Sequence, residues 1–378
     1  MKKPILLHIC CAPDATHPIE KLSREFDVSG YFYNPNIQPF SEYSKRVRDT
    51  EYTASSLGVS LYKGDYDVKR WSTLTTGLER ELEGGERCTI CYRMRLERTA
   101  RFARDMGFPW FTTTLTISPH KPSHIIFREG REAAVKYGVN FFEVDFKKGD
   151  GFKRSVEISK RLGLYRQDYC GCIHSLEQRL AIKEEKLAAL RHDVQTCDRC
   201  DFTKEGRVLP SGAAKSRIMV IGQAPGKHEI VTSKPFSGAA GRRLFDWFAQ
   251  IGVEEDAIRN LAYITATVKC YPGRLPQRKT DNCPSSIQIR HCTPFLEREI
   301  KIVRPQLLIP VGRLAVHQVI GPARLSEVVG GRFRRSVFDH FCTIVPLPHP
   351  SGANPWSFKN PERLHRALSL LKEELAGG

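Results

Sequence analysis

Short apolar runs alternate with charged, helix-like stretches along this chain, and this alternation restricts its possible folds more than any other feature. The strand-like runs of the first half are PILLHI, VSGYFYN, VSLYKGDY, WFTTTLTI and VNFFEVDF. The pattern starts again later with RIMVIGQAPG, LAYITATV, QLLIPVG and FCTIVPLP. Such alternation predicts mostly parallel sheets covered by helices, with ligands at the carboxyl ends of the strands. We therefore expect an α/β protein with two such domains.

The two repeats of this pattern are separated by a charged segment. SLEQRLAIKEEKLAALRHDVQ, from 175 to 195, contains no Gly or Pro and predicts one connecting helix. A chain of 378 residues also exceeds what one ordinary core accommodates. We expect a first domain over 1–176, a connecting helix over 177–195 and a second domain over 196–378.

The charge of the chain points to an anionic partner. A formal net charge of +17 attracts polyanions, and nucleic acid is the usual one, although a generally basic, well-solvated surface would have the same composition. No apolar run approaches the roughly 20 residues that a membrane span needs. The N-terminal MKKPILLHICCAPD is interpreted as a buried first strand, with a signal peptide as the alternative. We expect a cytoplasmic protein without a membrane partner.

Twelve cysteines, most of them in close pairs, suggest inorganic chemistry rather than a disulfide framework. Cys10-Cys11 and Cys88-x2-Cys91 can together supply four thiolates to zinc or to an iron–sulfur cluster. Adjacent cysteines favour the cluster, because two to four residues normally separate the first ligands of structural zinc. Cys170 and Cys172 flank one glycine and can close only a strained, labile disulfide, as suits a catalytic pair. The alternative is that they are two further metal ligands.

The first half resembles the QueH-type epoxyqueuosine reductases in LLHICCAPD, YFYNPNIQPFSEYSKR, GERCTICYRMRLE, FTTTLTISPHK, FFEVDFKKGDG and YRQDYCGCIHS. The resemblance implies a Rossmann-like domain that converts epoxyqueuosine to queuosine in the tRNA wobble position, with an electron donor that the sequence does not identify. It implies a [4Fe-4S] cluster on Cys10, Cys11, Cys88 and Cys91, and a redox-active pair at Cys170 and Cys172. The competing interpretation, an ATP-using tRNA thiolation enzyme, lacks a Gly/Ser-rich phosphate loop after the first strand.

One position in the first cysteine motif departs from many relatives, which have CCAPC where this chain has CCAPD. Asp14 offers a hard oxygen ligand and could hold an additional iron beside the cluster. The alternative is that Asp14 is the N-cap of a helix.

The second half has its own candidate ligands and a candidate pocket. Four cysteines in a two-plus-one-plus-one arrangement suggest a second closed metal site, namely Cys197, Cys200, Cys270 and Cys292. Cys283, in a basic loop, is either a substitute ligand or a free loop thiol. His349, held between prolines after the last strand, suggests a site opposite the Gly/Pro loop at Gly222, although a lone histidine is more often structural.

CDRC, GQAPG, KPFSGAAGRRL, YITATVKCYPG, CTPFLEREI and HPSG resemble the uracil-DNA glycosylase superfamily, nearest its iron–sulfur-containing branch. The resemblance implies a glycosylase-like α/β/α domain with a second [4Fe-4S] cluster on the four cysteines named above. Phe236 would stack on a flipped base, His349 would stabilise the departing base anion and Ser351 would contact a DNA phosphate.

Two positions differ from that branch. Gln223 replaces the usual glutamate that activates water, and Ala266 replaces the usual asparagine that reads uracil. The second domain is therefore expected to excise uracil or another deaminated base in DNA repair, or to be a nucleic-acid-binding module without turnover.

Overall fold

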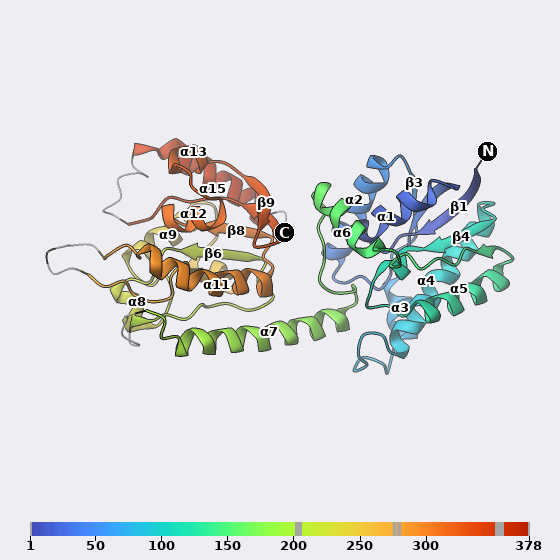
Figure 1. Ribbon diagram of the computed structural model, residues 1–378, viewed down its shortest axis with the longest axis horizontal. Coiled ribbons are helices and arrows are strands. Elements are labelled where there is room, and N and C mark those ends of the chain that lie inside the picture. Colours follow the sequence, from blue (N-terminus) through green and yellow to red (C-terminus); the bar gives the residue numbers. More distant parts are fainter. Residues whose placement is uncertain (1, 201–205, 275–276, 278–280, 352–358, 377–378) are drawn as a thin grey trace. The chain divides into compact units, whose positions relative to one another are not determined.

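The computed structural model describes residues 2–200, 206–274, 277, 281–351 and 359–376 (Figure 1). The chain forms two compact units, Met1–Arg179 and Leu180–Gly378. The division falls within helix α7 (Ile173–Thr196), which covers the expected connecting helix. The domain limits expected at residues 176 and 196 stay a prediction.

The first unit contains a five-stranded, wholly parallel sheet in the order β3-β2-β1-β4-β5. Its strands are β1 (Lys3–His8), β2 (Phe26–Phe32), β3 (Ser60–Lys63), β4 (Trp110–Thr113) and β5 (Asn140–Phe141). Its helices before α7 are α1 (Ala12–Leu22), α2 (Phe40–Ser56), α3 (Val68–Leu74), α4 (Glu86–Asp105), η1 (Thr114–Ile117), α5 (Ser123–Tyr137) and α6 (Gly151–Arg161).

The central strand β1 is buried on both faces, as its continuous apolar run predicts. Because neighbouring side chains of a strand point to opposite faces, Leu6 packs in the core under α4 and α5, and Ile5 and Leu7 pack in the core under α1. The layers on either side of the sheet are visible in Figure 1. The chain leaves this strand at its carboxyl end directly into Cys10 and Cys11.

The second unit contains a sheet in the order β7-β6-β8-β10-β9. Its strands are β6 (Ile218–Gly222), β7 (Ala262–Ala266), β8 (Leu307–Pro310), β9 (Phe333–Val337) and β10 (His340–Ile344). Its helices after α7 are α8 (Lys227–Thr232), α9 (Ala239–Ala249), α10 (Glu255–Leu261), α11 (Ser286–Val303), α12 (Arg313–Val319), α13 (Leu325–Val328) and α15 (Pro361–Ala376).

Helices cover both faces of the second sheet, with α7 and α11 on one side and α9 and α15 on the other (Figure 1). All strand pairs are parallel except β9 with β10, which form an antiparallel edge hairpin. The predicted fold class, two mostly parallel α/β domains, is confirmed.

Several elements begin or end differently from the sequence-based expectation. Helix α1 begins at Ala12 with Cys11 as its N-cap residue, so the interpretation of Asp14 as the N-cap is wrong. The stretch RMRLERTARFARDMG predicts a helix from Arg93, but α4 begins at Glu86, which places Cys88 and Cys91 within its first turns. The predicted strand over 110–117 ends at Thr113 and continues as the 3₁₀ helix η1. Within the described ranges, no helix is long and apolar enough to cross a membrane.

Candidate functional sites

The carboxyl end of β1 presents two buried thiols and a carboxylate. The Thr114 hydroxyl donates a hydrogen bond to Cys10 Sγ at 3.1 Å, and Cys10 Sγ lies 3.5 Å from Asp14 Oδ2. The ligand atoms of Cys10, Cys11 and Asp14 all lie within 4.8 Å of one another, and this group is the only one of its kind in the described part of the chain. A hydrogen bond between the adjacent thiols lowers the pKa of Cys10 and raises that of Cys11. Such a compact set suits one metal ion.

Helix α4 brings the second cysteine pair to the same region. Cys88 and Cys91, three residues apart, lie on one face of the helix and are 8% and 7% exposed. The backbone amide of Gly84 donates to Cys88 Sγ at 3.2 Å. Burial raises the pKa of Cys88 to about 11 and also raises that of Cys91, so both thiols hold their protons unless a metal replaces them.

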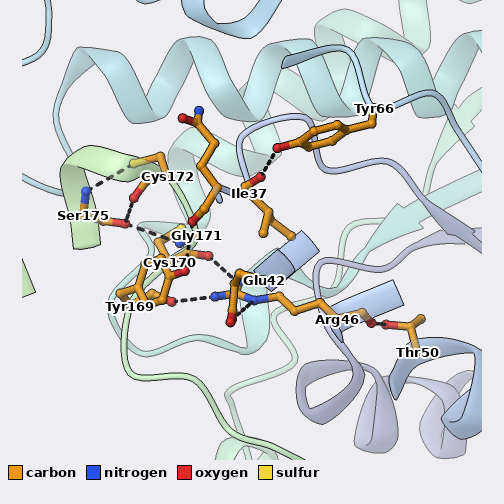
Figure 2. Close-up of polar contacts among 11 residues, drawn as sticks. Ile37, Glu42, Arg46, Thr50, Tyr66, Tyr169, Cys170, Gly171, Cys172 and Ser175 are labelled. Atoms are coloured by element: carbon orange, nitrogen blue, oxygen red, sulfur yellow. Dashed lines mark hydrogen bonds and ion pairs between the residues drawn. The ribbon is translucent and has the colours of Figure 1, made fainter. Parts of the chain in front are cut away.

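The loop before α7 contributes the third pair, drawn in Figure 2. Cys170 and Cys172 are present as two thiols. Burial raises the pKa of Cys170 to about 12, although Lys121 and Arg95 oppose this shift. Cys172 Sγ accepts a hydrogen bond from the backbone amide of Ser175 at 3.4 Å, in the first turn of α7.

The structure brings all six cysteines of the first unit together. Five of them share one core cluster, namely Cys10, Cys11, Cys88, Cys91 and Cys172. Cys170 lines a small cavity with Cys88, Cys91 and Cys172, beside Trp71 and Arg87. Each thiol pair comes from a different element: the end of β1, the start of α4 and the loop before α7. The expected assignment of ligands and of a redox pair among them stays a prediction.

Buried cations and unused donors show that the surroundings fit an anionic group. Lys121 and Arg95 are 8% and 2% exposed, and the positive charge of each interacts with the Cys10 and Cys170 thiol groups. Arg87 Nε and Nη2 are buried N–H groups without a hydrogen-bond partner among the described residues, and the side chains of Arg95 and Trp71 direct N–H groups at the Cys91 thiol. Buried donors and charges require compensation, and a cluster bound by four thiolates would provide it. The donor set and its surroundings therefore fit an iron–sulfur cluster.

The second unit contains a cavity of about 720 Å³ at the carboxyl ends of β6 and β7. Its lining includes every residue that the sequence suggested for base recognition and catalysis: Gln223, Phe236, Ala266, His349 and Ser351. Cys283 also lines it, and Gln223 Nε2 donates to Cys283 Sγ at 3.5 Å. Cys283 thus belongs to the cavity wall.

Phe236 is held rigidly in this wall. Its φ of 54° is unusual for a residue with a side chain. Glu229 accepts hydrogen bonds from the backbone amides of Gly226 and Phe236, and Arg259 donates to the Phe236 carbonyl at 3.1 Å. A Cβ at Gly241 would lie only 1.7 Å from the Phe236 carbonyl oxygen, so only glycine fits there. A fixed aromatic wall suits stacking on a planar ligand.

His349 is neutral in its resting state, because burial lowers its pKa. Its Nδ1 accepts a hydrogen bond from the backbone amide of Ser351 at 3.2 Å, so the neutral ring carries its proton on Nε2. Gly312, with a φ of 87°, packs against the ring, and a Cβ there would lie 3.1 Å from His349 Cδ2.

Beneath the cavity floor, a buried ion pair fixes the end of β7. Lys269 Nζ lies 2.9 Å from Glu299 and donates to the Ala266 carbonyl at 2.5 Å. The Thr265 hydroxyl donates to Glu299 as well. Ala266 therefore presents a methyl group, on a rigid backbone, at the position where the resemblance expects an amide.

Three of the four candidate ligands in the second unit converge. Cys270 and Cys292 are buried, and Cys197 packs against the core that contains Cys292. Burial raises the pKa of Cys292, and Cys270 and Cys197 add to the shift. Cys200 Sγ lies 3.5 Å from Nδ1 of His291, the residue before Cys292.

Several polar residues of the sites gave no signal in the sequence. Arg46, Arg95 and Lys121 lie in charged helices or loops that are indistinguishable from solvated segments. Glu229, inside KHEIVT, likewise looked like an ordinary surface charge. Only the tertiary structure shows that Arg46, Arg95 and Lys121 are buried near the cysteines of the first unit, and that Glu229 holds the backbone of the cavity wall in the second unit.

Comparisons with known proteins match the two units separately. The family model for epoxyqueuosine reductase QueH matches residues 5–178, and that for the uracil DNA glycosylase superfamily matches residues 209–372. An epoxyqueuosine reductase QueH of Thermotoga maritima is 41% identical over 178 residues, which cover 46% of this chain and 91% of the relative. Relatives with the same description from Streptococcus pyogenes and Haemophilus influenzae are 39% and 40% identical, and the matches cover 71% and 75% of their lengths.

The matches to those two relatives cover 46% and 48% of this chain. Among solved structures, a glycosyltransferase SnogD from Streptomyces nogalater aligns at 11% identity, over 100% of this chain and 95% of that chain, with a TM-score of 0.22. The two family models confirm the resemblance of the first half to QueH and of the second half to the uracil DNA glycosylase superfamily, whereas the iron–sulfur-containing branch stays a prediction.

Proposed function

Because the chain belongs, through residues 5–178, to the epoxyqueuosine reductase QueH family, we propose that its first unit reduces epoxyqueuosine to queuosine in tRNA. The observation that carries this proposal is the convergence of three cysteine pairs beside buried cations. Removing the epoxide oxygen to leave an alkene takes two electrons and two protons and releases water. The site contains groups for each of these needs.

The electrons are assigned to the cysteines. A [4Fe-4S] cluster held by Cys10, Cys11, Cys88 and Cys91 would supply single electrons when bound. Closing Cys170 and Cys172 to a disulfide releases two electrons and two protons, which matches the requirement of one epoxide. Cys170 holds its proton at neutral pH because burial raises its pKa to about 12. It is therefore suited to protonate a strongly basic group.

The oxygen side of the reaction is assigned to Lys121 and Asp14. Burial alone would lower the pKa of Lys121, but Cys170, Cys10 and Asp14 raise it, so the ammonium group stays charged. A fixed positive charge stabilises the negative charge that develops on the epoxide oxygen as the ring opens. Asp14, whose carboxylate lies beside Cys10, would hold an additional iron next to the cluster, and that iron would polarise the same oxygen.

A turnover assay tests this proposal. The protein, purified without oxygen and reduced with dithionite, is incubated with tRNA that carries epoxyqueuosine, and the digested nucleosides are measured by mass spectrometry. We expect queuosine from the wild type and none from Cys170→Ser. If the wild type with intact iron content forms no queuosine, the proposal is wrong.

For the second unit, we propose a nucleobase-binding pocket and a [4Fe-4S] cluster on Cys197, Cys200, Cys270 and Cys292. The support is the cavity with its fixed aromatic wall at Phe236 and a neutral His349. In a glycosylase, the Nε2–H of His349 would donate to the base anion that leaves, and Ser351 would contact phosphate. The alternative, a nucleic-acid-binding module, needs no proton donor.

Base release separates the two possibilities. The protein is incubated with duplex and single-stranded DNA that carries uracil, hypoxanthine or xanthine, and base release is compared with that of His349→Ala. Release that His349→Ala abolishes establishes a glycosylase and identifies its base. Binding without release establishes the binding module.

A further inference from the structure

The loop that contains Cys170 and Cys172 is held in place by a segment distant in sequence. The backbone amide of Gln38 donates to the Gly171 carbonyl at 2.8 Å, and the Tyr169 hydroxyl donates back to the Gln38 carbonyl at 3.0 Å. Figure 2 shows this segment and the start of α2 lying against the loop. The loop is thus fixed from outside by hydrogen bonds to its backbone.

Arg46, on α2, is the main contact. It is 2% exposed; its Nε donates to Glu42 Oε1 at 2.8 Å and its Nη1 donates to the Cys170 carbonyl at 2.9 Å (Figure 2). Its guanidinium also lies over the Tyr169 ring, 5.1 Å from the centroid. Burying the Arg46–Glu42 ion pair costs desolvation free energy and gives little net stability to the fold, so stability alone is a poor explanation for the pair.

Three consecutive carbonyls of the loop accept external or local donors. The Cys170 carbonyl accepts from Arg46 and the Gly171 carbonyl from Gln38, while the Ser175 hydroxyl donates to the Cys172 carbonyl at 2.9 Å. Gly171 has a φ of 144°, and a Cβ there would lie 3.2 Å from Arg46 Nη1. Both peptide groups between the two thiols are therefore fixed in orientation.

We propose that Arg46 is a positioning residue that stabilises the dithiol form of Cys170 and Cys172, and so sets the equilibrium between dithiol and disulfide. The inference rests on the proposed role of this pair in the first unit. The step concerned is the loss of two protons and two electrons from the two thiols as one S–S bond forms. In the test below, oxidised glutathione accepts both and becomes two molecules of glutathione.

The direction of the effect follows from the geometry of a small ring. A disulfide places its sulfurs about 2.05 Å apart. With one residue between the cysteines, closure must rotate the peptide groups whose carbonyls Arg46 and Gln38 hold. The Arg46 contact, present with the dithiol, thus opposes closure. Removing it makes the disulfide easier to form by about tenfold, or about 30 mV for a two-electron couple.

The redox state of the pair can be read directly from one peptide. Trypsin releases residues 167–179, QDYCGCIHSLEQR, which contain Cys170 and Cys172 and no other cysteine. The full chain is equilibrated without oxygen in glutathione buffers of graded redox ratio and then alkylated. The fraction of this peptide with two alkyl groups gives the dithiol population by mass spectrometry.

Four variants separate positioning from general damage. Arg46→Met combined with Glu42→Gln removes the pair without leaving a buried, unpaired charge. Arg46→Lys keeps the positive charge but loses the guanidinium, which donates to Glu42 and to the Cys170 carbonyl at the same time. Glu42→Gln alone weakens the contact that orients Arg46. Tyr66→Phe is the matched control, because it removes a hydrogen bond to the Ile37 carbonyl in the same segment without touching the cysteine loop.

We expect the double variant to shift the equilibrium of Cys170 and Cys172 about tenfold toward disulfide, and Arg46→Lys to shift it less. Tyr66→Phe should have the same equilibrium as the wild type. A double variant that coincides with the wild type, or shifts toward dithiol, overturns the inference. If the double variant does not fold, Arg46→Lys and Glu42→Gln decide by the same criterion. A wild-type pair that stays dithiol in every buffer would instead refute the redox role in the proposed function.

Discussion

Cys88 tests the assignment of cluster ligands at the level of one residue. Because Cys88 is one of four buried thiols in one core cluster that are proposed as cluster ligands, Cys88→Ala should remove the brown chromophore of the first unit and abolish queuosine formation. Iron content, the visible spectrum and turnover measure this. Cys342→Ala, which removes a buried thiol in the core of the second unit, is the control and should keep all three. Wild-type turnover in Cys88→Ala would end the cluster assignment.

Ala266 tests base recognition in the second unit. Its backbone is fixed through Lys269 and its side chain lines the cavity, so Ala266→Asn places an amide there with little rearrangement. A paired amide is worth about 1–3 kcal/mol in base discrimination, so uracil release or uracil binding should increase about 5- to 150-fold. Uracil-containing and cytosine-containing DNA are compared. An equal gain on both would show that the amide does not read the base.

The sequence identified reactive residues better than the residues that surround them. Cysteines have few roles, so close pairs such as Cys88-x2-Cys91 and Cys170-x-Cys172 pointed to a site by their spacing alone. Arg46 and Lys121 have many roles, and their burial depends on contacts between segments far apart in the chain. Asp14 lies beside Cys10, but its interpretation as an N-cap failed because the N-cap position of α1 is Cys11, three residues earlier.

At the scale of elements, α4 and α5 are joined by a buried carboxylate. Burial alone would raise the pKa of Glu129, but hydrogen bonds from Arg93 and Arg128 outweigh it and lower the pKa. The ionised form therefore stabilises the folded state above a pH of about 4.5, and this contribution is lost as pH falls through the lowered pKa.

Glu129→Gln should consequently cost about 1 kcal/mol at pH 7, since both arginines are half exposed, and nothing at the acid end. Urea unfolding of the wild type and of Glu129→Gln from pH 7 to pH 3.5 measures the difference. A difference that stays constant over this range would contradict the assignment.

Helix α7 is a core element of the second unit. Leu187, Leu190 and Val194 recur on one face of the helix and are at most 1% exposed, in the core with α11. Leu187→Ala should destabilise the second unit by about 2–5 kcal/mol, whereas Lys186→Ala, exposed on the same helix, should change little. Thermal unfolding monitored by circular dichroism measures both. Equal effects would show that α7 does not pack as described.

Element types were predictable where helical periodicity was long: SEYSKRVRDTEYTASSLG and KPSHIIFREGREAAVKYG predict the helices found as α2 and α5, and the charged connecting segment predicts α7. The central strands were located by their apolar runs. The short α3 and the edge strand β9 were missed, because charged sequences such as FRRSV lack a buried face. The strand predicted at β4 was too long, because strand-forming residues such as threonine continue into η1, where the chain turns beneath the site. Such turns are set by tertiary contacts of residues such as Thr114.

At the scale of the whole molecule, the proposed reductase site lies in the first unit, whereas the second unit has the larger net positive charge. Each unit has its own buried cores, and most of the excess positive charge lies in residues 180–378. We expect the full chain to have a lower KM for tRNA than residues 1–179 alone, with similar kcat. Raising the salt concentration should remove the difference, because counterion release drives such binding. An unchanged KM on truncation would show that the second unit does not assist the reductase.

The burial of the four cysteines proposed as ligands in the first unit would also govern how metal enters and leaves the site. Cys10, Cys11, Cys88 and Cys91 are each at most 8% exposed, so a chelator in solution cannot reach them while the fold is closed. Exchange then waits for local opening of the chain, and its rate reports the free energy of that opening rather than the affinity for iron. Maturation would have to occur on a partly open chain, and a closed protein would keep its metal for as long as it stays folded.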